Sequence, residues 1–154
     1  MAKFYSTKTY GNDRGLSCAF RQWRSTHSHC SLIHGYSIGI KLIFECDTLD
    51  ERNWVMDFGG LKDFKDWAEH MFDHTWLVAN DDPHKDFFLT FPEEAATIRL
   101  VDAVGCERFA EMAYRKMSSI IDKQIADGSA LNRTVRVKSV EVFEHGSNSA
   151  IYEG

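Results

Sequence analysis

The sequence predicts an α+β fold, in which an antiparallel sheet carries helices on one of its faces. Segments with the two-residue alternation of strands lie near both ends of the chain, and two segments with helical spacing lie between them. This succession of strands, helices and strands favours an antiparallel sheet. The 154 residues are 44% hydrophobic and no linker or repeat divides them, so residues 1–154 should form a single domain.

The N-terminal strands are predicted at residues 3–10 and 16–20. The cluster Gly-Asn-Asp-Arg-Gly at residues 11–15 is typical of a turn and separates them. Residues 21–29 are polar and show no period, so we expect a loop there, which is a common location for the wall of a site.

The most regular strand is predicted from Tyr36 to Phe44. Its apolar face comprises Tyr36, Ile38, Ile40, Leu42 and Phe44. His34 is in phase with this face, so His34 and Tyr36 should project together where the strand begins, and Gly35 lets the backbone pass closely. We therefore expect a site at this end of the strand.

Two helices and a final pair of strands are predicted beyond residue 60. One helix spans residues 61–72, and the second runs from about Cys106 to Ala126. Residues 80–100 show no clear period and are expected to be irregular. Residues 135–142 form an apolar strand whose phase slips near Lys138, as a bulge requires, and a short strand follows at residues 149–152.

Composition excludes several classes of protein. The net charge of −5 comes without a basic stripe, which argues against nucleic-acid binding. No apolar run is long enough to cross a bilayer and none suits a signal peptide, so we expect no membrane partner and a cytoplasmic location. The four cysteines lack CxxC spacing, so they should be reduced thiols rather than a disulfide framework.

Cys30 is the first candidate for chemistry. A thiol becomes reactive when a nearby cation, metal or helix terminus stabilises its thiolate, and His27, His29 and His34 lie close in sequence. The alternative is that Cys30 is a small buried apolar residue.

Asp73, His74 and Glu144 are the other candidates. A carboxylate next to an imidazole makes either a proton relay or a cap at a helix end. A carboxylate at the end of a strand is either solvated or, in a pocket, able to accept two parallel hydrogen bonds from the amidine-like edge of a pterin.

Several motifs together resemble those of the tunnelling-fold pterin synthases, which include 6-pyruvoyl-tetrahydropterin synthase and the bacterial 6-carboxytetrahydropterin synthase of queuosine biosynthesis. Residues 30–36 match the Cys-x3-His-Gly-His motif of the carboxy branch except at the last position. Residues 56–62 are similar to Met-Asp-Phe-Gly-x-Leu-Lys, and residues 72–77 to Leu-Asp-His-x-x-Leu. Cys106-Glu107 resembles a Thr/Ser-Glu segment, and residues 142–153 resemble the segment that carries the pterin-anchoring glutamate.

The resemblance implies the tunnelling fold (T-fold), an antiparallel four-stranded sheet with two helices on one face. It also implies a lyase that converts 7,8-dihydroneopterin triphosphate to 6-carboxytetrahydropterin, releasing triphosphate and acetaldehyde. In this interpretation Cys30 is the base, Asp73 and His74 form the relay, and Glu144, with Glu107, binds the pterin. A homo-oligomer with sites at subunit interfaces is expected.

The resemblance further implies a zinc ion held by three histidines, which would polarise the side-chain oxygens of the substrate. Of the three ligand positions only His34 matches, because Phe20 and Tyr36 stand at the others. His29 or His27 would have to replace the lost ligands. Arg21, Arg24 and Lys41 are candidates for contacts with the triphosphate.

Three functions remain open from the sequence. The first is the carboxy-type lyase, with zinc rebuilt around His34 or dispensed with. The second is a related T-fold enzyme with altered, metal-free chemistry on a dihydropterin. The third is a non-catalytic module that binds a pterin or purine through Glu144.

Overall fold

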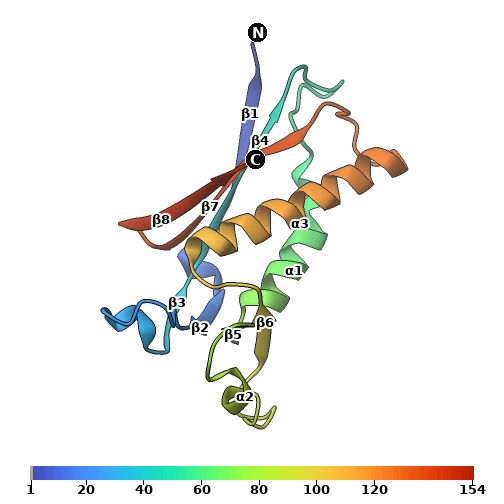
Figure 1. Ribbon diagram of the computed structural model, residues 1–154. Coiled ribbons are helices and arrows are strands. Elements are labelled where there is room, and N and C mark those ends of the chain that lie inside the picture. The colour runs from blue at the N-terminus through green and yellow to red at the C-terminus, as the bar shows by residue number, and fades with distance from the viewer. Residues whose placement is uncertain (1) are drawn as a thin grey trace.

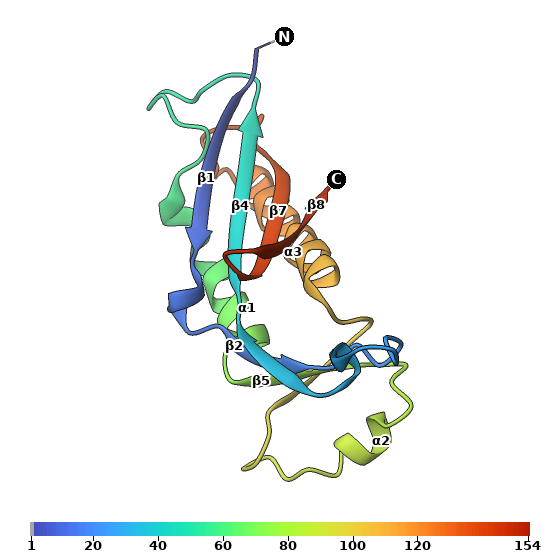
Figure 2. The ribbon, with the colours of Figure 1, turned by 90° about the vertical axis from the view of Figure 1, so that its left-hand side faces the viewer.

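A long antiparallel sheet, sheet A, forms one side of the computed structural model, which describes residues 2–154 (Figure 1). Its order is β1-β4-β7-β8, and its strands are β1 (Phe4–Tyr10), β4 (Gly39–Cys46), β7 (Arg136–His145) and β8 (Asn148–Glu153). The helices α1 (Lys62–Phe72) and α3 (Cys106–Asp127) lie on one face of this sheet. Figure 2 views the opposite face, which neither helix covers. The predicted α+β architecture is therefore confirmed.

The core lies between sheet A and the two long helices. Ile38, Ile40, Leu42 and Phe44 are completely buried, as their alternation predicted, and α3 places Phe109 and further apolar residues against them. Each such side chain contributes about 1.5–3 kcal/mol by leaving water. No helix in residues 2–154 combines the length and the apolar character that crossing a membrane requires.

The bulge predicted near Lys138 is present in β7. Ile43 of β4 lies opposite Ser139, whereas the next residue, Phe44, lies opposite Val137. Lys138 is thus the extra residue. Because of it, Val137 and Val140 both lie on the buried face although they are three residues apart. The predicted last strand corresponds to β8.

A second sheet, sheet B, was not predicted. Its order is β3-β2-β5-β6, and its strands are β2 (Ser17–Phe20), β3 (His34–Ser37), β5 (Thr75–Ala79) and β6 (Ile98–Val101). β2 pairs with β3 antiparallel, but the β2–β5 and β5–β6 pairs are parallel. The expectation of an irregular segment at residues 80–100 was wrong at β6 and at the short helix α2 (Lys85–Phe88). Such short elements carry too few residues to show a period.

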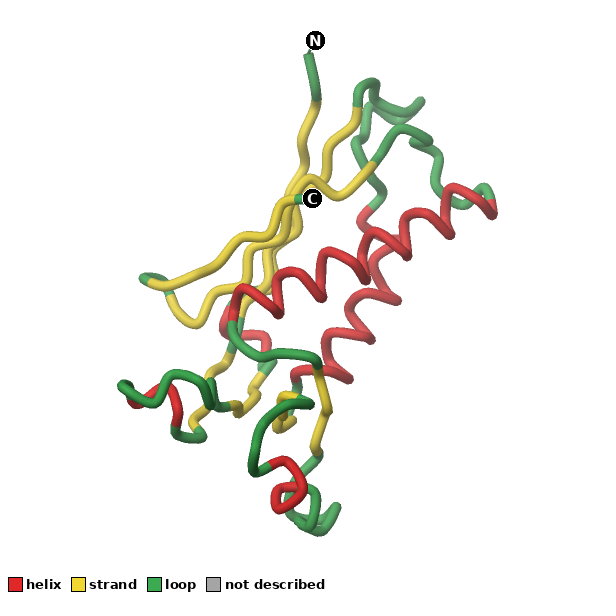
Figure 3. Tube along the Cα trace, viewed as in Figure 1, coloured by secondary structure: helices red, strands yellow, loops and turns green. Residues whose placement is uncertain are grey.

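The strand expected from Tyr36 to Phe44 is in fact divided between the two sheets. β3 ends at Ser37 and β4 begins at Gly39. The amide of Ile38 donates to the carbonyl of Leu16 at 3.0 Å. Figure 3 shows sheet B and its long loops gathered at one end of sheet A.

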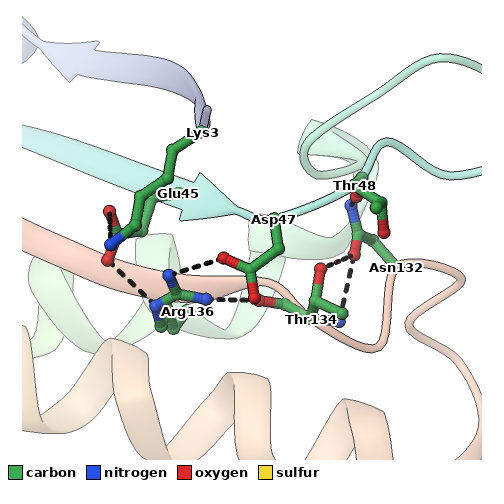
Figure 4. Close-up of polar contacts among 7 residues, drawn as sticks. All are labelled: Lys3, Glu45, Asp47, Thr48, Asn132, Thr134 and Arg136. Atoms are coloured by element: carbon green, nitrogen blue, oxygen red, sulfur yellow. Dashed lines mark hydrogen bonds and ion pairs between the residues drawn. The ribbon is translucent and has the colours of Figure 1, made fainter. Parts of the chain in front are cut away.

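A polar cluster fixes the other end of sheet A (Figure 4). Glu45 is only 7% exposed, and Arg136 Nε donates to its Oε1 at 2.9 Å while Lys3 Nζ lies 3.6 Å from its Oε2. Arg136 also donates to Asp47 at 3.2 Å. These contacts join β1, β4 and β7, and they compensate a carboxylate that would otherwise be buried without a partner.

Replacing Arg136 with methionine should therefore lower the free energy of unfolding by about 2 kcal/mol, because Glu45 loses its nearest cation and a charge-assisted hydrogen bond. Urea denaturation followed by circular dichroism measures this. Arg52→Met is the matched control: Arg52 pairs with Asp57 at the surface, so the loss should stay below about 1 kcal/mol. Equal losses in the two variants would contradict the role given to Glu45.

Candidate active site

Three aromatic rings meet where β2 and β3 pair. Phe20 lies opposite His34 and Cys18 lies opposite Tyr36, so these four side chains share one face of sheet B. The ring centroids of Phe20 and His34 are 6.0 Å apart, those of Phe20 and Tyr36 also 6.0 Å, and those of His34 and Tyr36 5.2 Å. The structure thus brings together the three positions that the resemblance assigned to zinc ligands, and His34 and Tyr36 project together as predicted.

Asn12 ties this cluster to the end of β7. Its side-chain amide donates to the carbonyl of Ser37 at 2.8 Å, and to those of Phe143 and Glu144 at 3.2 Å each. The half-buried Glu144 therefore lies beside the start of β4 and faces Tyr36. Sequence reasoning interpreted Asn12 only as a turn residue, because two of its three partners, Phe143 and Glu144, are more than a hundred residues away.

Glu144 is surrounded by groups that can donate hydrogen bonds. Burial raises the pKa of Tyr36, and the charge of the Glu144 carboxylate and a hydrogen-bonding interaction with it raise that pKa further. Burial likewise raises the pKa of the Cys106 thiol to about 12, with additional effects from Glu144 and Glu107. Both side chains therefore stay protonated at neutral pH and lie near the Glu144 carboxylate. Cys106 begins α3, whereas Glu107 points to solvent in its first turn.

Cys30 lies at the edge of the same cluster. It is half-buried in a short 3-10 turn (His29–Ser31), and its charge also contributes to the raised pKa of Tyr36. Its carbonyl accepts from the amide of Gln22 at 2.8 Å, which places Cys30 just beyond the end of β2. Cys30 and Glu144 therefore both lie near Tyr36, and their assignment to one functional site stays a prediction.

The predicted loop after β2 is held in place by arginines. Arg21 donates to both carboxylate oxygens of the buried Asp82, at 2.8 and 2.7 Å, and to the carbonyl of Ser31 at 3.1 Å. Arg24 pairs with Asp81 at 2.8 Å. Two of the cations considered for a triphosphate are therefore already neutralised by acidic residues.

Asp73 and His74 form the expected pair but lie elsewhere. Asp73 Oδ1 is hydrogen-bonded to His74 Nδ1, and the His74 side chain is 86% exposed. The amide of His74 donates to Ser17 at the start of β2, whereas Cys30 bonds to Gln22 beyond its end. Ser17 and Gln22 are five positions apart, which corresponds to roughly 16 Å along an extended chain. The backbone contacts of His74 and Cys30 therefore lie at opposite ends of β2.

The residues at the three family ligand positions do not fit a zinc ion. His34 is suitable: its Nδ1 donates to the carbonyl of Leu32 at 2.7 Å, which leaves Nε2 as a free acceptor. Phe20 has no donor atom, and a neutral phenol such as Tyr36 is a poor ligand beside imidazole. His27 and His29 are exposed, and within residues 2–154 no three His, Cys, Asp or Glu side chains are grouped closely enough to hold a metal.

Comparison with known proteins identifies the family. The family model of 6-pyruvoyl tetrahydropterin synthase matches residues 12–154. The chain belongs to this family. A 6-carboxy-5,6,7,8-tetrahydropterin synthase of Aquifex aeolicus is 23% identical over 124 residues, which cover 80% of this chain and 75% of that protein. The protein of the same name from Rickettsia conorii is 32% identical over 54 residues, 34% of this chain and 39% of that protein.

Solved structures establish the same fold. An uncharacterized protein of Wolinella succinogenes superposes with a TM-score of 0.79 at 18% identity, covering 100% of this chain and 99% of that one. A 6-pyruvoyltetrahydropterin synthase of Plasmodium vivax superposes with a TM-score of 0.69 at 16% identity, with the same coverage. The expected T-fold is therefore confirmed.

One thiol in each native chain should react with Ellman's reagent at pH 7.5, and all four in urea. Cys18, Cys46 and Cys106 are at most 7% exposed. Burial also raises the pKa of Cys18 and of Cys106 to about 12, so at pH 7.5 very few of these two thiols are ionised to the reactive thiolate. Cys30 is the accessible one. The variant Cys30→Ser should show no labelling in the native state, and labelling that persists would place another thiol at the surface.

Proposed function

We propose that this chain is a lyase that cleaves the side chain of a dihydropterin, with 7,8-dihydroneopterin triphosphate as substrate and 6-carboxy-5,6,7,8-tetrahydropterin as product. The observation that carries the proposal is the position of Cys30 beyond one end of β2 and of Glu144 beside the end of β3, both near Tyr36. The names of the relatives from Aquifex and Rickettsia support it. Triphosphate and acetaldehyde would be released, and the product would serve queuosine biosynthesis.

Each side chain has a distinct role in this proposal. The Glu144 carboxylate accepts two parallel hydrogen bonds from the N–H and the amino group of the pterin, which fixes the ring. Cys30, which also lies near Tyr36, takes a proton from the substrate side chain. The buried Phe20 ring, 2% exposed, keeps water away from one side of these contacts.

The position of the relay supports a homo-oligomer as part of this proposal. Asp73 and His74 are hydrogen-bonded to each other. The backbone of His74 contacts one end of β2, whereas that of Cys30 contacts the chain beyond the other end. Their exposure makes them available to a neighbouring copy. The edge strands β1 and β8 of sheet A offer unpaired backbone groups through which copies can associate.

A second candidate is a metal-free aldol cleavage or epimerisation of a dihydropterin without a triphosphate. The pairing of Arg21 with Asp82 and of Arg24 with Asp81 favours it, because both cations are then unavailable to phosphate. Incubation with dihydroneopterin and with its triphosphate, followed by chromatography of the products, separates the two reactions.

Glu144→Gln should weaken pterin binding about tenfold to a hundredfold, because an amide cannot accept two parallel hydrogen bonds from the pterin edge. Fluorescence titration measures the affinity, and turnover of dihydroneopterin triphosphate should fall in parallel. Glu141→Gln is the control, since Glu141 lies on the same strand and bonds only to Ser149. Unchanged affinity in Glu144→Gln, or no turnover of either substrate by the wild type, would sink the proposal.

Cys30→Ala and His74→Ala should each lower turnover by about a hundredfold or more, the usual loss when a proton-transfer group is removed. Oligomers formed by mixing and refolding the two variants should regain turnover, because some sites then combine an intact Cys30 from one chain with an intact His74 from another. Mixtures as inactive as the parents would exclude a shared site.

A further inference from the structure

The aromatic cluster lacks the donor atoms that a zinc ion needs. Its ring centroids lie 5.2 to 6.0 Å apart, but only the His34 ring carries a strong zinc ligand, whereas structural and catalytic zinc sites use at least three protein ligands. Phe20 is 2% exposed and packs edge-on against Phe109 of α3, with centroids 5.1 Å apart. The first ligand position has thus become part of the hydrophobic core.

The second changed position has acquired a different partner. The Tyr36 ring packs against Phe20 and His34, and the end of β7 lies beside it, because the carbonyls of the next residue, Ser37, and of Glu144 both accept from the Asn12 amide. We infer that the pterin site of this chain works without zinc, and that Tyr36 instead donates a hydrogen bond that positions the Glu144 carboxylate. The role of Tyr36 as a positioning residue rests on the function proposed above, whereas the absence of a zinc requirement does not.

The acceptor capacity of Glu144 matches this arrangement. An ionised carboxylate offers about four lone-pair sites. In this inference Tyr36 and Cys106, which both lie near Glu144, supply two donors from the protein, and two sites remain for the paired donors of a pterin edge. Asn12 fixes the backbone of the same residue through the Glu144 carbonyl. The carboxylate is therefore oriented before the ligand arrives, which lowers the cost of binding.

Elemental mass spectrometry of untagged protein tests the zinc inference directly. The wild type, incubated with excess zinc and desalted, should hold no stoichiometric metal. The double variant Phe20→His/Tyr36→His should hold about one zinc ion per chain, because it restores three imidazoles at converging positions. Tyr36→His alone, which keeps the Phe20 packing, should bind zinc more weakly and covers the case in which the double variant fails to fold. Stoichiometric zinc in the wild type that is lost in His34→Ala would overturn the inference.

The role of Tyr36 has two separate tests. Tyr36→Phe should weaken pterin binding about tenfold and reduce the preference for pterin over lumazine, which lacks the 2-amino group, while Tyr114→Phe, on α3 against Tyr152, should change neither. Without ligand, Tyr36→Phe and Glu144→Gln should be non-additive in urea denaturation, which reports their contact. Additive effects together with unchanged preference would exclude the positioning role.

These outcomes distinguish the inference from the function on which it partly rests. If the wild type binds no pterin, the proposed function fails, yet metal analysis and the denaturation cycle still decide whether zinc is absent and whether Tyr36 contacts Glu144. If pterin binds and a chelator abolishes that binding, the function stands and the inference fails.

Discussion

The passage of the chain from sheet B to sheet A at Ile38 and Gly39 is the constraint on which the site depends. A Cβ on Gly39 would lie 2.1 Å from the ring of Phe143, so any side chain at residue 39 would force that ring out of its position. The Ile38 amide bonds to Leu16 at the same point. Because β3 and β4 continue from this junction in different sheets, Tyr36 at the end of one sheet comes to face Glu144 at the end of the other.

At residue 20 of the ring cluster, packing in the core and metal binding would require different side chains. A ligand at residue 20 would have to present a polar atom toward the site, but Phe20 instead packs on Phe109, which in turn contacts Phe72 of α1. Burying an aromatic side chain of this size stabilises the fold by about 1.5–3 kcal/mol. Sheet B is therefore joined to both long helices through a residue that cannot bind metal.

The parts of the structure that were predictable are those whose pattern lies within one element. The alternation around Ile40 and Leu42, the stripe of α3 and the phase slip at Lys138 each report a local contact with the core. β5 was missed because all five of its residues are buried, so it has no alternation, and its parallel partners lie far away in sequence. Motif resemblance located Cys30 and Glu144, but only the tertiary structure brings Tyr36, Asn12 and Cys106 to them.

The distance between Cys30 and His74 is set by the position of β2 inside sheet B. β2 is hydrogen-bonded to β3 on one side and to β5 on the other. The separation between its two ends is therefore fixed by the sheet. Arg21, bonded to the buried Asp82, holds the loop that carries Cys30, and the backbone of His74 is bonded to Ser17. Closure of a loop therefore cannot bridge roughly 16 Å. A reaction that needs both groups at one substrate would have to draw them from two chains, so in this fold the oligomer would be a requirement of the chemistry.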